Sequence, residues 1–228
     1  MIPLLLAAQV LVVGPGAGHM TIGAALAAAP AGARIVVRTG VYRERIVVDR
    51  RVTLEGEGLP VIDGGGEGTV VTVTADSAVF RGFVVRNVAT SFTDDRAAIK
   101  VGGADGVRIE ENEVRDAFFG IYVAASDGGL IAGNRVLGPF RSTSASGNAI
   151  HLWNSRGWTV RDNEVRGHRD GIYLEFGRHT RVTGNRSEAN RRYGLHFMFS
   201  DSSAYAHNVF RRNGAGVAVM YARQVTMR

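Results

Sequence analysis

The stretch VRIEENEVRDAFFGIYV, residues 107–123, decides the fold, because its pattern returns further along the chain. WTVRDNEVRGHRDGIYL (158–174) and TRVTGNRSEANRRYGLHF (180–197) repeat its order of short apolar runs, one asparagine and one glycine. The asparagines of this column are Asn112, Asn134, Asn163, Asn185 and Asn208, at separations of 22, 29, 22 and 23 residues. The long step contains GPFRSTSASGN (138–148), a polar stretch that supplies the seven extra residues as a loop. An internal repeat is therefore the main feature of this chain.

Each repeat holds two or three short alternating strands, such as GIYV (120–123), and none contains a useful helical period. Short strands at a constant pitch indicate a solenoid whose coils stack at the ordinary interstrand spacing of ~4.8 Å. A propeller blade would need roughly 40 residues, which excludes that fold. The repeat predicts an all-β protein: a right-handed, single-stranded parallel β-helix of the pectin-lyase-like type. Each asparagine is expected at a corner, with its amide bonded to the asparagines of the neighbouring coils.

The two ends of the repeat region differ. Thr21 is a good N-cap for a short helix that closes before Pro30 and covers the first coil. The apolar start, residues 1–8, predicts a truncated export signal that runs into a first strand at QVLVV. We expect one β-helix domain over residues 9–228, whose C-terminal coils and cap are missing, because VTMR (225–228) begins a new coil.

Bulk composition narrows the classes of function. The chain has 228 residues, 45% of them hydrophobic, and no cysteine, which excludes disulfides, Cys-based zinc sites and thiol catalysis. Its formal charge of +6 comes almost entirely from arginines spread along the chain, whereas nucleic-acid binding calls for a clustered patch. No apolar run is long enough to span a bilayer. We therefore expect no nucleic-acid partner and no transmembrane segment.

With the register fixed, one strand of each repeat presents two outward rows of side chains. The inward positions are Ile121, Ile150, Ile172, Leu195 and Val217, then Val123, Leu152, Leu174, Phe197 and Val219. The outward positions are Tyr122, His151, Tyr173, His196 and Ala218, and beside them Ala124, Trp153, Glu175, Met198 and Met220. The spacing places Met220 beside Met198, with Cβ atoms roughly 5–7 Å apart. Thioether and imidazole groups form a soft donor set that suits Cu(I). The copper ligands predicted from this geometry are His196, Met198, Met220, Glu175 and His151.

Two other interpretations of these residues stay open. A flat outer sheet with aromatic, methionine and histidine side chains is also typical of a protein contact surface, here formed by Trp153, Tyr173 and Tyr122. A carbohydrate-active enzyme, such as a polysaccharide lyase, hydrolase or epimerase, is the alternative function. GHRDG (167–171) would then place His168, Arg169 and Asp170 in an exposed groove, although the same residues also make a good solvated turn. The other histidines are expected to be ordinary surface residues.

The last repeats carry a more specific signal. RYGLHFMFS (192–200), NVF (208–210), NGAG (213–216) and AVMY (218–221) resemble the hallmark of the NosD family, the periplasmic maturation proteins of nitrous-oxide reductase. The upstream TGVYRERIVVDRRVTLEGEGLPVIDG (39–64) is similar to first coils shared by many sugar-active β-helices.

The resemblance implies a non-enzymatic accessory protein in the periplasm. Members of the family sit, peripheral to the membrane, on an ABC-type permease with a cytoplasmic ATPase. Together with a copper chaperone they help to build the copper–sulfur centre of nitrous-oxide reductase. The resemblance supplies no copper ligands, so the proposed ligand set depends on geometry alone.

Overall fold

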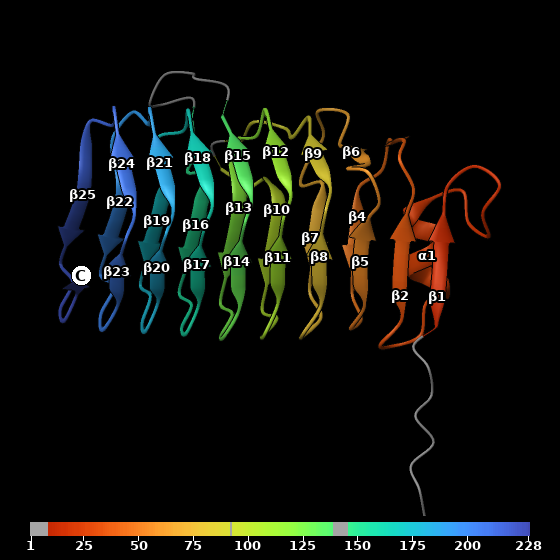
Figure 1. Ribbon diagram of the computed structural model, residues 1–228, viewed down its shortest axis with the longest axis horizontal. Helices are drawn as coiled ribbons and strands as arrows, with labels where there is room; N and C mark the ends of the chain where they lie inside the picture. The colour runs from red at the N-terminus through yellow and green to blue at the C-terminus, as the bar shows by residue number, and fades with distance from the viewer. Residues whose placement is uncertain (1–8, 92, 139–145) are drawn as a thin grey trace, which may run out of the picture.

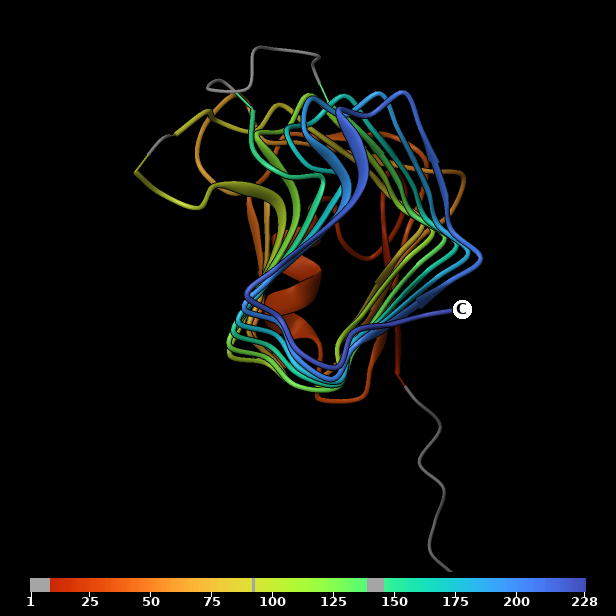
Figure 2. The ribbon, with the colours of Figure 1, turned by 90° about the vertical axis from the view of Figure 1, so that its left-hand side faces the viewer.

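The computed structural model describes residues 9–91, 93–138 and 146–228. Over these residues the chain is a parallel β-solenoid with one short helix (Figure 1), which confirms the fold predicted from the repeat. A view along the solenoid shows the coils lying one behind another with common corners (Figure 2). The expected export signal, residues 1–8, and most of the expected loop, residues 139–145, lie outside the described residues.

Three parallel sheets form the walls of the solenoid. The first sheet contains β1 (Val10–Val13), β2 (Arg34–Val37), β5 (Thr53–Gly56), β8 (Val79–Arg81), β11 (Arg108–Glu110), β14 (Leu130–Ala132), β17 (Thr159–Arg161), β20 (Arg181–Thr183), β23 (Ala204–Ala206) and β26 (Thr226–Met227). β1 is the first strand expected from QVLVV, and Tyr205 pairs with Met227 as the repeat predicts.

The other two walls follow the same order along the solenoid. The second sheet contains β3 (Val41–Tyr42), β6 (Val61–Asp63), β9 (Val84–Arg86), β12 (Glu113–Arg115), β15 (Arg135–Leu137), β18 (Glu164–Arg166), β21 (Arg186–Glu188) and β24 (Val209–Arg211). The third contains β4 (Ile46–Val48), β7 (Val71–Val73), β10 (Ala97–Gly102), β13 (Phe119–Ala124), β16 (Ile150–Trp153), β19 (Ile172–Glu175), β22 (Tyr193–Met198) and β25 (Ala215–Met220). The candidate site lies on the outer face of this third sheet.

The interior is a continuous apolar stack. Strand alternation directs Val, Ile, Leu and Phe inward on all three walls, and these side chains form one core cluster from Leu11 to Phe197. The side chains at the predicted inward positions are buried in every coil as far as Leu195 and Phe197. Trp158 is fully buried, and its indole Nε1 donates to the carbonyl of Ser126 at 2.9 Å. Burial of this much apolar surface holds the coils in register.

The asparagine column forms the expected ladder at a corner. The side-chain amide of Asn112 donates to Oδ1 of Asn134 at 3.0 Å, and the same bond repeats from Asn134 to Asn163, from Asn163 to Asn185 and from Asn185 to Asn208. Each Oδ1 also accepts a backbone N–H of the preceding asparagine. The buried amides are therefore satisfied by one another and by backbone groups.

A helix closes the N-terminal end. α1 (Ile22–Ala28) lies within the outline of the coils in Figure 2, with Ile22, Ala25 and Leu26 buried against the core. Thr21 is the N-cap, as predicted, and its side chain accepts from Ala24 N at 3.2 Å. The Glu44 carboxylate, 22 residues on, accepts from the N–H groups of Ile22 and Gly23, each at 2.9 Å. A distant side chain thus completes the cap.

Candidate functional site

The register on the outer face of the third sheet is the one that the repeat predicts. Strand pairing aligns Tyr122, His151, Tyr173 and His196 in one row. It aligns Ala124, Trp153, Glu175, Met198 and Met220 in the next row. We call these the covered row and the thioether row.

The covered row is not solvated, contrary to expectation. Tyr122, His151, Tyr173 and His196 are all buried, although they point away from the core. Their rings contact one another in order, with centroid distances of 4.9, 4.7 and 4.7 Å. Groups from outside the sheet lie over the row: Asn148 contacts His151, Arg192 contacts His196, and Asp95 lies beside Tyr122. The segment between β9 and β10, which contains Asp95, bulges beyond the outline of the other coils (Figure 2).

The burial of Tyr122 and Tyr173 contradicts the expectation that they form a contact surface. Tyr122 and Tyr173 cannot present their rings to a partner, so the prediction that they form an exposed face is wrong. Alternation along a strand reports only which side of a sheet a residue occupies, and here other segments cover that side. Trp153, in the thioether row, is 38% exposed, and its role in partner binding stays a prediction.

Burial also sets the protonation of the covered row. It raises the pKa of the Tyr173 hydroxyl to about 12 and raises that of Tyr122 as well. Burial lowers the pKa of His151, although the nearby Glu175 carboxylate opposes this shift. The His151 imidazole, whose Nε2 lies 3.5 Å from Glu175 Oε2, in turn lowers the pKa of Glu175. His151 and Glu175 are therefore partners of each other, which weakens the case for either as a copper ligand.

His196 is held differently. Its Nδ1 faces Oδ2 of Asp170 at 3.3 Å, and Asp170 is fully buried. The other carboxylate oxygen, Oδ1, lies 3.3 Å from both Arg192 Nε and the backbone N–H of Tyr193. Within the described part of the chain, Nε2 of His196 is buried and has no hydrogen-bond partner. A carboxylate on one ring nitrogen and a free second nitrogen is the arrangement that metal-binding histidines adopt.

The thioether row supplies the remaining donors. Met198 lies two residues beyond His196 on the same face, and strand pairing aligns Met198 with Met220; both are half-buried. Over residues 9–91, 93–138 and 146–228, no group of three or more His, Asp or Glu side chains could hold a metal ion. An imidazole and two thioethers are donors that suit a soft ion such as Cu(I).

The residues of the alternative carbohydrate site are buried rather than exposed. His168 and Asp170 have no solvent-accessible surface, and only Arg169 of this turn is half-buried. The expectations of an exposed groove, of a solvated turn and of a surface His168 are therefore wrong. GHRDG has the composition of a polar turn, yet residues of the next coil cover it. The side-chain oxygen of Asn190 accepts the backbone N–H of His168, and Oδ1 of Asp170 accepts the backbone N–H of Tyr193.

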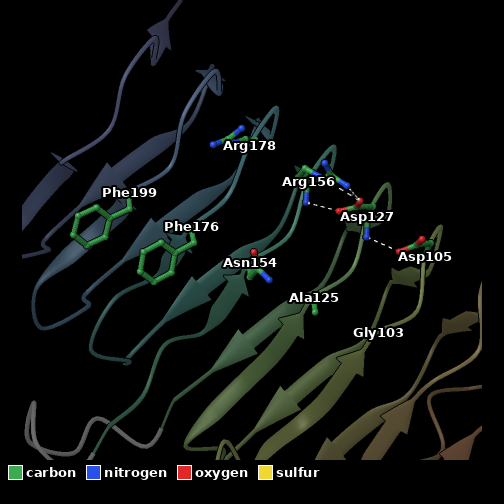
Figure 3. Close-up of a pocket in the computed structure, with 9 residues that line it drawn as sticks. All are labelled: Gly103, Asp105, Ala125, Asp127, Asn154, Arg156, Phe176, Arg178 and Phe199. Carbon is green, nitrogen blue, oxygen red and sulfur yellow. Dashed lines mark hydrogen bonds and ion pairs between the residues drawn. The ribbon is translucent and has the colours of Figure 1, made fainter.

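The sequence reasoning missed a row of exposed aromatic residues at the adjacent corner. Phe176, Phe199 and Tyr221 follow the thioether row directly, and we call them the corner aromatic stack. Phe176 and Phe199 line a shallow groove of about 570 Å³ (Figure 3). Their separations of 23 and 22 residues match the repeat and were the available signal.

Comparison with known proteins identifies relatives for part of the chain. The model of the family described as "Periplasmic copper-binding protein (NosD)" matches residues 138–228, which confirms the resemblance found in the sequence. The probable ABC transporter binding protein NosD of Pseudomonas aeruginosa is 37% identical over 134 residues, and that of Stutzerimonas stutzeri is 30% identical over 134 residues. Each match covers 58% of this chain and 31% of the relative, so the chain spans less than a third of these relatives.

Solved structures share the fold at low identity. A family 28 exopolygalacturonase of Yersinia enterocolitica aligns with a TM-score of 0.59 and 11% identity, covering 97% of this chain and 66% of that one. A pectin methylesterase in complex with a hexasaccharide aligns with a TM-score of 0.51 and 15% identity over 80% of each chain. This likeness supports the pectin-lyase-like fold alone. None of the helices in the described part of the chain has the length and apolarity that a membrane span requires.

Proposed function

We propose that this chain belongs to a periplasmic accessory protein that handles Cu(I) as cargo and works beside an ABC-type transporter during maturation of the copper centre of nitrous-oxide reductase. The family model matched by residues 138–228 describes a periplasmic copper-binding protein. The relatives are named as ABC transporter binding proteins. A copper chaperone, the permease and the reductase are the partners that this role requires, and the role involves no catalysis.

One observation carries the copper proposal. His196 is buried, its Nδ1 faces a buried carboxylate, and its Nε2 has no partner among the described residues. The buried Nε2 atoms of His151 and His168 also lack a hydrogen-bond partner among the described residues, so what distinguishes His196 is the carboxylate on its Nδ1 together with the two methionines beside it. Met198 and Met220 are the nearest soft donors by register. His196, Met198 and Met220 would hold the ion; His151 and Glu175 are weaker candidates because they face each other.

Anaerobic titration with Cu(I) against a chromogenic competitor tests this proposal. We expect one tight equivalent in the unaltered chain, and at least tenfold weaker binding in His196→Ala and Met198→Ala. The matched controls are His207→Ala and Met227→Ala, since both residues are exposed and lie outside the site. Affinities unchanged in both site variants would end the copper proposal. Co-purification with the permease and its ATPase tests the transporter association separately.

A further inference from the structure

Arg192 places a positive charge beside the ring that the proposed copper site offers to a cation. Its Nη2 lies 3.5 Å from Nδ1 of His196, and its guanidinium lies over the Tyr193 ring, 4.9 Å from the centroid. The neighbouring coils hold its backbone on both sides: the N–H of Arg192 donates to the carbonyl of Arg169 at 2.8 Å, and its carbonyl accepts the N–H of Ala215 at 2.7 Å. The base of this side chain is therefore fixed next to His196.

Orientation of the imidazole does not require this arginine. The Oδ2 atom of Asp170 already faces Nδ1 of His196, and Oδ1 accepts the backbone N–H of Tyr193, each at 3.3 Å. Arg192 adds a third contact, from Nε to Oδ1 at 3.3 Å. A positive charge beside the ring opposes the entry of a cation, because like charges repel more strongly where water is excluded. The presence of Arg192 therefore calls for a reason other than affinity.

A second pair of opposite charges lies on the thioether side. Strand pairing places Glu175 beside Met198, and Oε2 of Glu175 lies 3.5 Å from Nε2 of His151. The contact with His151 is the main cause of the lowered pKa of Glu175, and the positive charge of Arg169 acts in the same direction. Glu175 therefore carries its negative charge next to Met198, and Arg169 supplies the opposite charge.

The site is neutral before an ion enters, because two carboxylates and two guanidinium groups surround it and its imidazole and thioethers add no charge. A monovalent ion leaves one uncompensated charge beside His196, which is 2% exposed, and a divalent ion leaves two. We propose that Arg192 sets the charge of the copper site proposed above, on whose existence this inference depends, and makes it select a monovalent soft ion over a divalent one. The donors alone discriminate less, since imidazole also binds divalent ions.

Charge selection of this kind links two affinities. The repulsion between a guanidinium and a bound ion is proportional to the charge of the ion. Removal of the Arg192 charge should therefore change the binding free energy of a divalent ion twice as much as that of a monovalent ion, so that the fold-change in affinity is squared. The Arg192 side chain is 37% exposed and solvent screens it, so we expect gains of about tenfold for a monovalent ion and about a hundredfold for a divalent ion.

Ag(I) and Cd(II) are matched probes, because both are soft ions with the same filled d shell and they differ in charge. Calorimetric titration of the full chain in chloride-free buffer measures both affinities, and we expect the unaltered chain to prefer Ag(I) by at least about a hundredfold. Arg192→Gln keeps an amide donor for Asp170 but removes the charge, and it should bind Ag(I) about tenfold and Cd(II) about a hundredfold more tightly. Arg192→Lys keeps the charge and should stay within about threefold for both ions.

The controls separate charge from structure. Arg181→Gln alters an exposed arginine on β20, in another wall, and should change neither affinity. Circular dichroism and the nitrogen-15 shift of Nδ1 of His196 check that Arg192→Gln keeps the fold and the contact with Asp170. A gain for Cd(II) no larger than that for Ag(I) overturns the inference, since a structural effect does not scale with the charge of the ion. An unaltered chain that binds neither ion, or Ag(I) binding unchanged in His196→Ala, overturns the copper site itself and this inference with it.

Discussion

Replacing Asp170 with Asn should switch the ring proton of His196 to the wrong nitrogen. We expect Nδ1 of His196 to carry a proton, because the Asp170 carboxylate that faces it can only accept; in the neutral tautomer the lone pair is then on Nε2. In Asp170→Asn the side chain keeps its shape and can still accept from Arg192 and from the Tyr193 N–H through Oδ1. Its NH2 group then faces Nδ1, which must become the acceptor, and the proton moves to Nε2.

The size of the effect follows from the geometry. Loss of a carboxylate that orients a metal-binding histidine weakens binding about 10- to 100-fold. A free-energy change of about 1.4 to 2.7 kcal/mol corresponds to that range. Stability should fall by about 1–3 kcal/mol, since a buried hydrogen-bonded charge is removed while Arg192, which is partly exposed, stays solvated.

Two measurements separate positioning from stability. Nitrogen-15 NMR of the copper-free protein should show His196 protonated on Nδ1 in the unaltered chain and on Nε2 in Asp170→Asn. The competitor titration should show the loss in Cu(I) affinity. Glu188→Gln is the matched control because Glu188 is another buried carboxylate, paired with Arg186 at 2.7 Å on a different sheet. It should lose comparable stability without a change at His196.

A single result would refute this reasoning. If Asp170→Asn keeps the proton of His196 on Nδ1 and binds Cu(I) within twofold of the unaltered chain, Asp170 does not position the imidazole. If Glu188→Gln weakens Cu(I) as much as Asp170→Asn does, the loss reflects stability rather than positioning.

Three further predictions concern the scaffold. Burial lowers the pKa of His168 to about 4. In the unfolded chain this histidine takes up a proton near pH 6.5, whereas in the folded chain it stays neutral down to about pH 4. The free energy of unfolding therefore falls as the pH drops from 6.5 to 4, by about 3 kcal/mol at most. Burial lowers the pKa of His151 as well, so His151 acts in the same direction. Urea unfolding at several pH values should show a shallower pH dependence of the free energy of unfolding in His168→Gln. The same slope in both proteins would contradict the lowered pKa of His168. Asn163→Ala removes four side-chain hydrogen bonds, to Asn134 (two), Ile131 and Asn185, and should lower the free energy of unfolding by about 4 kcal/mol, measured as a shift in the urea midpoint at constant m-value. Glu44→Ala removes two hydrogen bonds from the N-terminus of α1 and leaves the Thr21 cap in place, and it should cost about 1–2 kcal/mol, with faster hydrogen exchange confined to residues 22–28.

From Asn112 onward, the register of the solenoid was predictable from one column of asparagines. Asn112 and the asparagines that follow it in the column set the coil length. The pairing of His151 with Tyr173, and of Met198 with Met220, then followed by counting residues. Counting works because each coil must place the same backbone positions over one another to complete its hydrogen bonds. The helix cap was predictable locally from Thr21, whereas Glu44 was not, because its contact depends on where the second coil returns.

Solvent exposure of the outer face was not predictable in the same way. The alternation that directs His196 outward says nothing about Arg192 and Tyr193, which lie over it, or about Asp95 beside Tyr122. Corner residues and inserted segments do not share the strand period, so their path over the sheet is set by tertiary packing. The same limitation hid Phe176 and Phe199, which belong to a corner and not to a strand.

The outward residues of β22 and the corner residue after it pass from the buried to the exposed part of this surface. His196 is 2% exposed and bound by Asp170, Met198 is half-buried, and Phe199 is 41% exposed at the corner. An ion that reaches His196 from the corner side would meet a thioether before an imidazole. Thioethers bind Cu(I) without a proton being displaced, whereas the imidazole must offer a neutral nitrogen, and Asp170 keeps that nitrogen available. If the proposed copper site is correct, the corner and the thioethers would control entry, and the covered histidine would control retention.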